Sequence, residues 1–135
     1  MPSFFFSLSN SLSLPLSLPP LAILNPNNAI SRYAPEAIHS NTFTTKSDAW
    51  AWGITFWEIM ASGATPYGEQ TGTQVLQLLE RGQRLAIPTE FSVGHLAPCC
   101  RLLEKVWLSD PRARPSFAEI YTVMHSVVPE TTEGM

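Results

Sequence analysis

The chain has 135 residues, and its 8 basic and 11 acidic side chains give a formal net charge of −3. A slightly acidic chain has no basic surface for phosphate backbones, so we expect no nucleic-acid partner. Hydrophobic residues make up 44% of the chain, which is enough for one domain with one modest core. The two cysteines, Cys99 and Cys100, are adjacent, which excludes a small disulfide-rich secreted domain. No spacing of His or Cys residues suggests a metal site, so a reducing compartment is the simplest environment for the chain.

Residues 1–30 differ in composition from the rest of the chain. No charged side chain precedes Arg32, and the segment consists mostly of Leu, Ser and Pro. We interpret it as a low-complexity leader that is either disordered or the product of a misjoined gene start. A secretory signal peptide is the alternative, although the segment lacks basic N-terminal residues and Pro15 and Pro19 interrupt its apolar run. The same Ser and Pro residues argue against a transmembrane helix.

Two helices are predicted in the first part of the remaining chain. The first, residues 47–60, is apolar on nearly every face, which is typical of a helix enclosed by other elements. Ser47 or Asp48 is expected to cap its N-terminus, and Gly63 is expected to end it. The second helix, residues 73–81, is amphipathic and predicted to be half-exposed, with apolar residues at helical spacing: Val75, Leu76 and Leu79.

A third helix is predicted over residues 99–107 and a fourth over residues 116–128, where Ser116 and Glu119 form a capping-box pattern. The residues expected to face the core are Leu102, Leu103, Val106 and Trp107 in the third helix, and Phe117, Ile120, Tyr121, Met124 and Val127 in the fourth. No segment alternates as a strand would. The folded part, residues 31–128, is therefore predicted to be all-α with about four main helices, followed by a flexible tail at residues 129–135.

Several short motifs occur in a fixed order along the folded part. They are Ala34-Pro35-Glu36, Ser47-Asp48-Ala49-Trp50-Ala51-Trp52-Gly53, Trp57-Glu58-Ile59, Thr65-Pro66-Tyr67, Val106-Trp107 and the run from Asp110 to Phe117. Together they resemble the C-terminal half of the large lobe of a protein tyrosine kinase, from the A-P-E motif that closes the activation segment to the last helix. The resemblance covers residues 30–128 and implies the lower half of a kinase large lobe as the fold. Residues 54–59 and 63–67 are most similar to receptor tyrosine kinases, in particular to the Axl, Mer and Tyro3 group.

The resemblance implies that the full-length protein catalyses ATP-dependent phosphorylation of protein tyrosine, with ATP and Mg²⁺ as cofactors and proteins as substrates. It also implies an intracellular location, on the cytoplasmic side of a membrane if the full-length protein is a receptor. This chain, however, contains no Gly-rich loop, no V-A-I-K, no H-R-D and no D-F-G motif. We therefore expect no catalytic, cofactor-binding or metal-binding residue here. We interpret the chain as an inactive fragment of a tyrosine kinase, truncated upstream of the A-P-E motif.

A non-catalytic, kinase-like module that binds proteins is the alternative. It would act through the predicted helix at residues 73–82, with kinase partners or chaperones as its binding partners. A third possibility, a secreted helical module, requires that the leader is cleaved. We expect the isolated chain to be marginally stable, because the upstream elements that cover the first helix in the family are missing. The apolar residues expected to be exposed for this reason include Trp52, Phe56 and Trp57.

The residues before Glu36 correspond to the platform that receives the substrate peptide in tyrosine kinases. That platform usually reads Pro, an aliphatic residue, Arg or Lys, Trp and one further residue. The ungapped sequence here is Ala29-Ile30-Ser31-Arg32-Tyr33, although with one deletion Arg32 and Tyr33 could stand for the basic and aromatic residues. We therefore interpret one run as an altered remnant of the platform: Ile30, Ser31, Arg32, Tyr33, Ala34 and Pro35.

Other residues have structural roles by the same resemblance. Glu36 is expected to form a buried ion pair with Arg114, which would tie the end of the activation segment to the last helices. Asp48 is expected to cap its own helix, because the catalytic loop that it contacts in the family is absent. Further structural residues are Trp50, Gly53, Trp57 and Trp107. Thr55 and Ile59 are expected in the core, and Arg81 and Arg84 on a solvated edge.

Overall fold

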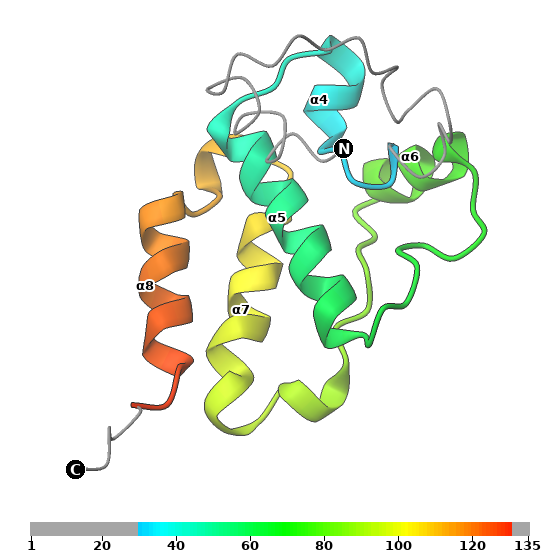
Figure 1. Cartoon of the computed structure of the whole chain (residues 1–135). Coiled ribbons are helices and arrows are strands. Elements are labelled where there is room, and N and C mark those ends of the chain that lie inside the picture. Colours follow the sequence, from blue (N-terminus) through cyan, green and yellow to red (C-terminus); the bar gives the residue numbers. More distant parts are fainter. Residues whose placement is uncertain (1–29, 131–135) are drawn as a thin grey trace, which may run out of the picture.

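The computed structural model describes residues 30–130, so the predictions for residues 1–29 and 131–135 lie outside it. In this part five α-helices follow one another (Figure 1): α4 (Pro35–Ser40), α5 (Thr45–Met60), α6 (Gly72–Glu80), α7 (Ala97–Val106) and α8 (Phe117–Val127). Between them lie three short 3-10 turns: η1 (Thr89–Phe91), η2 (Gly94–Leu96) and η3 (Pro111–Ala113). Residues 30–130 contain no strand, so the all-α prediction is confirmed, and the short helix α4 is additional to those predicted. No helix in this range is long and apolar enough to span a bilayer.

Helix α5 begins at Thr45 and is capped by Thr44. The Thr44 hydroxyl accepts a hydrogen bond from the Ser47 amide at 3.2 Å, and the Ser47 hydroxyl accepts one from the Thr44 amide at 2.8 Å. Ser47 is thus the third helical residue of a capping box, and Asp48 follows it inside the helix. The expectation that Ser47 or Asp48 caps α5 is therefore wrong, because Thr44 already satisfies the first free amides. Helix α5 ends at Met60 with Ala61 as its C-cap, and Ser62, at φ +56°, is the left-handed residue that turns the chain away. Gly63 follows this end, as predicted, and its amide donates to the Glu58 carbonyl at 2.8 Å.

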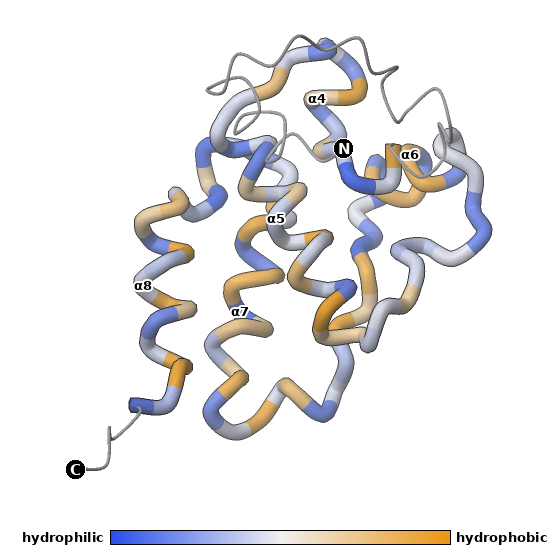
Figure 2. Tube along the Cα trace, in the orientation of Figure 1, coloured by the Kyte–Doolittle hydropathy of each residue, from blue (hydrophilic) through white to orange (hydrophobic). Residues whose placement is uncertain are grey.

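Helix α5 lies at the centre of the fold, with α7 packed along it and α8 on the outer side of α7 (Figure 1). Apolar and polar positions alternate along α7 and α8, as expected for helices with one buried face (Figure 2). The close approach of α5 and α7 depends on Gly53. A Cβ atom there would lie 2.6 Å from Val106 Cγ2 and 2.8 Å from Trp107 Nε1, so the position has no room for a side chain.

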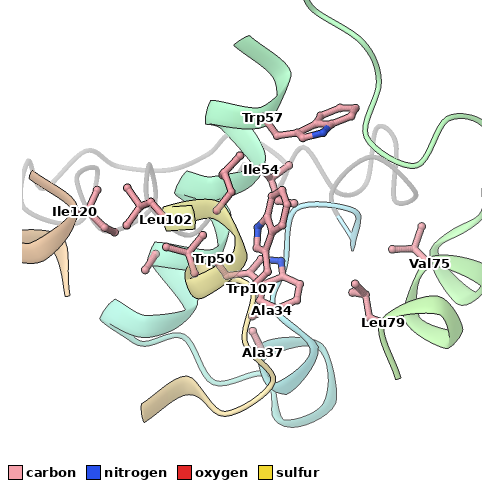
Figure 3. Close-up of a cluster of buried hydrophobic side chains, with 13 residues drawn as sticks. Ala34, Ala37, Trp50, Ile54, Trp57, Val75, Leu79, Leu102, Trp107 and Ile120 are labelled. Carbon is pink, nitrogen blue, oxygen red and sulfur yellow. The ribbon is translucent and has the colours of Figure 1, made fainter. Parts of the chain in front are cut away.

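The core joins all five helices around Trp50, whose side chain is fully buried. Figure 3 shows this cluster of side chains, with large aromatic rings from Trp50 and Trp57 of α5 and from Trp107, the residue that follows α7. Its members are Ala34, Ala37, Ala49, Trp50, Ile54, Trp57, Val75, Leu79, Leu102, Leu103, Val106, Trp107 and Ile120. The face predicted for α7 is confirmed, because all four of its predicted core residues are buried.

Three burial predictions are wrong. Trp57 was expected to be exposed but is 8% exposed, because its indole N–H donates to the Ala86 carbonyl at 2.8 Å and the segment after α6 covers the ring. Ile59 was expected in the core but is 71% exposed, since two residues past Trp57 a helix has turned by about 200°. Tyr121 of α8 is 68% exposed, because α8 packs on α7 through the face that carries Ile120 and Met124. Trp52, Phe56 and Thr55 are half-buried.

Candidate functional site

The end of the A-P-E motif is held by a buried arginine. Arg114 Nη1 and Nη2 donate to Glu36 Oε1 and Oε2 at 2.6 and 2.9 Å, which makes a bidentate pair. The Arg114 side chain has no exposed surface, whereas that of Glu36 is 30% exposed. The remaining donors of Arg114 bind the carbonyls of Leu108 at 2.8 Å and Lys46 at 3.2 Å. The pair named by the resemblance is therefore present, and it joins the start of α4, the start of α5 and the loop before α8.

Lys46 reinforces this junction from the other side. Its Nζ donates to the Arg114 carbonyl at 2.5 Å, while Arg114 binds the Lys46 carbonyl. The two residues are 68 positions apart in the sequence, and their reciprocal bonds fasten the first turn of α5 to the loop before α8. A buried guanidinium is tolerated when its N–H groups are hydrogen-bonded and a carboxylate balances its charge. Removing either the arginine or the glutamate leaves the other charge without a partner.

Two guanidinium groups contact the ring of Trp50. Arg114 Cζ lies 4.9 Å and Arg84 Cζ 5.0 Å from the ring centroid, both within the range of a cation–π interaction. Arg84 Nε donates to the Trp107 carbonyl at 2.7 Å, and Nη1 donates to the Leu79 carbonyl at 3.1 Å. Arg84 thus binds the C-terminal ends of α6 and α7 together. The expectation that Arg84 lies on a solvated edge is wrong, because its donors find backbone carbonyls that the helix ends leave free.

The electrostatics around Arg84 agree with its partial burial. Burial lowers the pKa of Arg84 below its ordinary value, with the neighbouring Arg114 charge as a smaller contribution in the same direction. Burial also raises the pKa of Tyr67 to about 12, although the charge of Arg84 acts against this shift. Tyr67 is therefore a neutral phenol at ordinary pH. Arg81, which was also expected on a solvated edge, is exposed.

The platform remnant forms a turn directly before α4. The Tyr33 amide donates to the Ile30 carbonyl at 3.1 Å, Ser31 and Ala34 are buried, and Pro35 is the first residue of α4. Tyr33 packs edge-on against Phe43 with ring centroids 5.3 Å apart, and partial burial raises the pKa of its hydroxyl. Arg32 binds Glu58 of α5, with Nη2 and Oε2 2.9 Å apart and Nη1 in contact with Oε1. The sequence analysis included Glu58 in the Trp57-Glu58-Ile59 motif but did not predict its ion pair with Arg32.

Asp48 is buried and keeps one polar atom without a partner. The residue is 4% exposed, and its Oδ1 accepts no hydrogen bond within the part of the chain that the structure describes. The indole N–H groups of Trp50 and Trp107 are buried without an acceptor in the same part. Because Thr44 caps α5, the expected capping role of Asp48 is wrong. An unsatisfied buried oxygen costs about 1–3 kcal/mol, so Asp48 is poised to accept a donor from elsewhere.

Within residues 30–130 the two cysteines form no disulfide, and the acidic residues form no cluster that could hold a metal ion. Cys99 and Cys100 are free and buried; Cys99 Sγ lies 3.9 Å from Met124 Sδ, and Cys100 Sγ donates to the Phe91 carbonyl at 3.1 Å. Burial raises the pKa of both thiols, so they remain protonated and poorly nucleophilic. Within residues 30–130 no group of three or more His, Cys, Asp or Glu side chains is placed to hold a metal ion.

Comparison with known proteins shows that the chain is similar to protein kinases. Residues 25–124 match the family described as protein tyrosine and serine/threonine kinase. The chain is 42% identical over 90 residues to tyrosine-protein kinase HTK16 of Hydra vulgaris, covering 67% of this chain and 11% of that protein. It is 39% identical over 87 residues to ephrin type-A receptor 1 of Mus musculus, covering 64% of this chain and 8% of the receptor. It is also 38% identical over 92 residues to inactive tyrosine-protein kinase 7 of Mus musculus, covering 67% and 8%. The chain thus spans about a tenth of the length of these relatives.

Proposed function

Because this chain belongs to the protein tyrosine and serine/threonine kinase family, we propose that it is a part of a tyrosine kinase whose complete form transfers phosphate from ATP to tyrosine of protein substrates. The observation that carries the proposal is the Glu36–Arg114 pair, in which the carboxylate of the A-P-E motif is bound by an arginine 78 residues later. The pair fixes the end of the activation segment against the last helices. The platform remnant begins four residues before Ala34, next to this fixed point.

The chain by itself is a structural portion of that enzyme rather than a catalyst. Phosphoryl transfer requires groups that cradle the phosphates, hold Mg²⁺ and orient the attacking hydroxyl. The 135 residues contain no H-R-D or D-F-G motif, and residues 30–130 hold no acidic cluster for a metal. ATP and Mg²⁺ therefore do not fit the residues present, and no catalytic step is assigned to them. The free Oδ1 of Asp48 supports a further segment of the kinase packing on the N-terminal part of α5.

The location of the complete protein follows from the same proposal. ATP is an intracellular substrate, and the two free cysteines are compatible with a reducing compartment. We therefore place the kinase portion on the cytoplasmic side of the cell. Membership of a receptor subgroup such as Axl, Mer and Tyro3 would add a membrane anchor outside this chain, and protein substrates belong to the complete form alone.

The experiment that tests the proposal starts with the transcript. Long-read sequencing through its 5′ end should show a reading frame that continues upstream of Ile30 into H-R-D and D-F-G motifs. The encoded protein, incubated with Mg²⁺ and labelled ATP, should then phosphorylate a copolymer of glutamate and tyrosine. The 135-residue chain at equal concentration should give no more label than a reaction without protein. A transcript that starts at Met1 would exclude catalysis and leave the non-catalytic binding module, and an upstream frame whose product labels no tyrosine would equally refute the proposal.

A further inference from the structure

The chain contains three tyrosines, and all three lie in the part that the structure describes. Tyr33 and Tyr67 are half-buried, whereas Tyr121 of α8 is 68% exposed. A second protein can modify a tyrosine only where it can reach the hydroxyl, so the three positions are not equivalent. Burial separates one accessible tyrosine from two that the fold retains.

Tyr33 and Tyr67 are retained by their packing. The Tyr33 ring contacts the Phe43 ring edge-on, with centroids 5.3 Å apart, and the Tyr67 ring packs against the core cluster. Burial raises the pKa of both hydroxyls, that of Tyr67 to about 12. Neither hydroxyl can enter the active site of another protein unless these contacts are first broken.

Tyr121 lies beside the face through which α8 packs on α7. Its ring stacks on the exposed ring of His125, with centroids 5.6 Å apart and an angle of 8° between the planes. Ile120 is the one buried residue of α8, whereas α5 contains eight, so α8 opens locally at a lower cost than α5. The Tyr121 hydroxyl can therefore be presented to a second protein without disruption of the central helix.

The neighbours of Tyr121 on α8 also tolerate a new negative charge. The residues one turn away are Phe117, Ala118, Met124 and His125, none of which is acidic. A phosphate on tyrosine carries a charge of about −2 near neutral pH. At position 121 it would meet no like charge one turn away, and an anion followed four residues later by a protonated imidazole stabilises a helix. The folded chain can therefore hold a phosphate at this position.

We propose that Tyr121 is a phosphorylation site, where a separate tyrosine kinase uses this chain as its substrate. The Tyr121 oxygen attacks the γ-phosphorus of ATP held by that kinase, the bond from this phosphorus to the bridging oxygen breaks, and ADP leaves. The phenolic proton passes to the base of that kinase, and the product is a phosphate monoester on α8. The chain supplies only the hydroxyl, so the inference goes beyond the proposed function and does not depend on the activity of the complete protein.

The test mixes the 135-residue chain with Mg²⁺, ATP and a purified tyrosine kinase domain whose activity on a copolymer of glutamate and tyrosine has been confirmed. Peptide mapping by mass spectrometry should place about tenfold more phosphate on Tyr121 than on Tyr33 or Tyr67, because accessibility limits the reaction. Tyr121→Phe should lower the total label about tenfold, whereas the matched control Tyr33→Phe should change it by less than about twofold.

Two synthetic peptides, residues 61–73 and 115–127, show whether the fold makes this selection. Tyr67 should be labelled at least about thirtyfold faster in its peptide than in the chain, and Tyr121 no more than about fivefold faster, because only Tyr67 is protected by burial. The phosphorylated chain should also keep the urea midpoint of the unmodified chain, since the phosphate meets no like charge on α8.

Three results would overturn the inference. Equal label on all three tyrosines would show that the kinase acts on unfolded molecules. An unlabelled chain, with a kinase that labels the copolymer, would show that α8 withholds its tyrosine. A lower urea midpoint after phosphorylation would show that the folded chain does not accommodate the phosphate. The kinase is supplied separately, so a complete protein without kinase activity would refute the proposed function and leave these readouts unchanged.

Discussion

Two parts of helix α5, residues 47–54 and residues 55–60, are both rich in apolar residues but differ in how they are enclosed. From Ser47 to Ile54 nearly every residue is buried, and Arg114, Arg84 and α7 surround Trp50. From Thr55 to Met60 only Trp57 is buried, Ile59 is 71% exposed, and Phe56 is half-buried, with its ring stacked on that of Trp52 one turn earlier. The comparison shows that the N-terminal part is enclosed both by α7 and by two arginines, which bind backbone carbonyls and the Glu36 carboxylate around it. Stability should therefore be concentrated there.

The strongest test of this difference is the removal of Arg114. Arg114→Met should destabilise the chain by about 3–5 kcal/mol, because it leaves Glu36 without its partner and two carbonyls without donors. That loss approaches the whole stability of a small domain. Urea denaturation followed by tryptophan fluorescence measures it. Arg112→Met is the matched control, since its side chain is 91% exposed, and its midpoint should not move. If both substitutions lowered the urea midpoint equally, stability would not be concentrated around the N-terminal part of α5.

Arg84 tests whether the second guanidinium on Trp50 also contributes. Arg84→Met should cost about 2 kcal/mol, because bonds to the Trp107 and Leu79 carbonyls and the ring contact are lost together. Arg81→Met changes a neighbouring arginine that is exposed, and its midpoint in urea should stay close to that of the parent. If the two variants unfold at the same urea concentration, Arg84 is the solvated residue that its sequence position suggested.

These arginines also show what sequence reasoning could and could not predict. The pair between Glu36 and Arg114 was named because both residues lie in recognisable motifs. Arg84 was missed because its partners are backbone carbonyls, which no side-chain pattern reveals. The partner of Glu58 was missed because Arg32 lies 26 residues away, and in the ungapped comparison Ser31 rather than Arg32 stands at the basic position of the platform.

Periodicity and capping patterns predicted the helices better than the exposed faces. Helix α8 begins with the predicted capping box of Ser116 and Glu119, and α7 buries the predicted side. In α5 the apolar residues occupy every face, so periodicity could not distinguish the buried Trp57 from the exposed Ile59. Which face is covered depends on the segment after α6, and that is a tertiary property.

Gly53 tests the contact that encloses the N-terminal part from the side of α7. Gly53→Ala should destabilise by about 1–2 kcal/mol, because the new methyl would meet Val106 Cγ2 at 2.6 Å even though alanine favours the helix. In a Val106→Ala background the same substitution should cost less, since the nearest obstructing atom is gone. A double-mutant cycle in urea measures the coupling. Strict additivity of the two substitutions would show that α5 and α7 do not depend on this close approach.

The C-terminal part should respond least to substitution. Ile59→Ser removes an apolar side chain that is already 71% exposed, so the free energy of unfolding should change by no more than about 0.5 kcal/mol. The matched change Ile54→Ser, one turn and a half earlier and fully buried, should cost several times more because it leaves a cavity and buries a hydroxyl. Light scattering on the same samples should show less association for Ile59→Ser, since the substitution removes a large apolar side chain from the surface. A large loss of stability in Ile59→Ser would mean that this part of α5 is covered in solution, and the contrast between the two parts would then disappear.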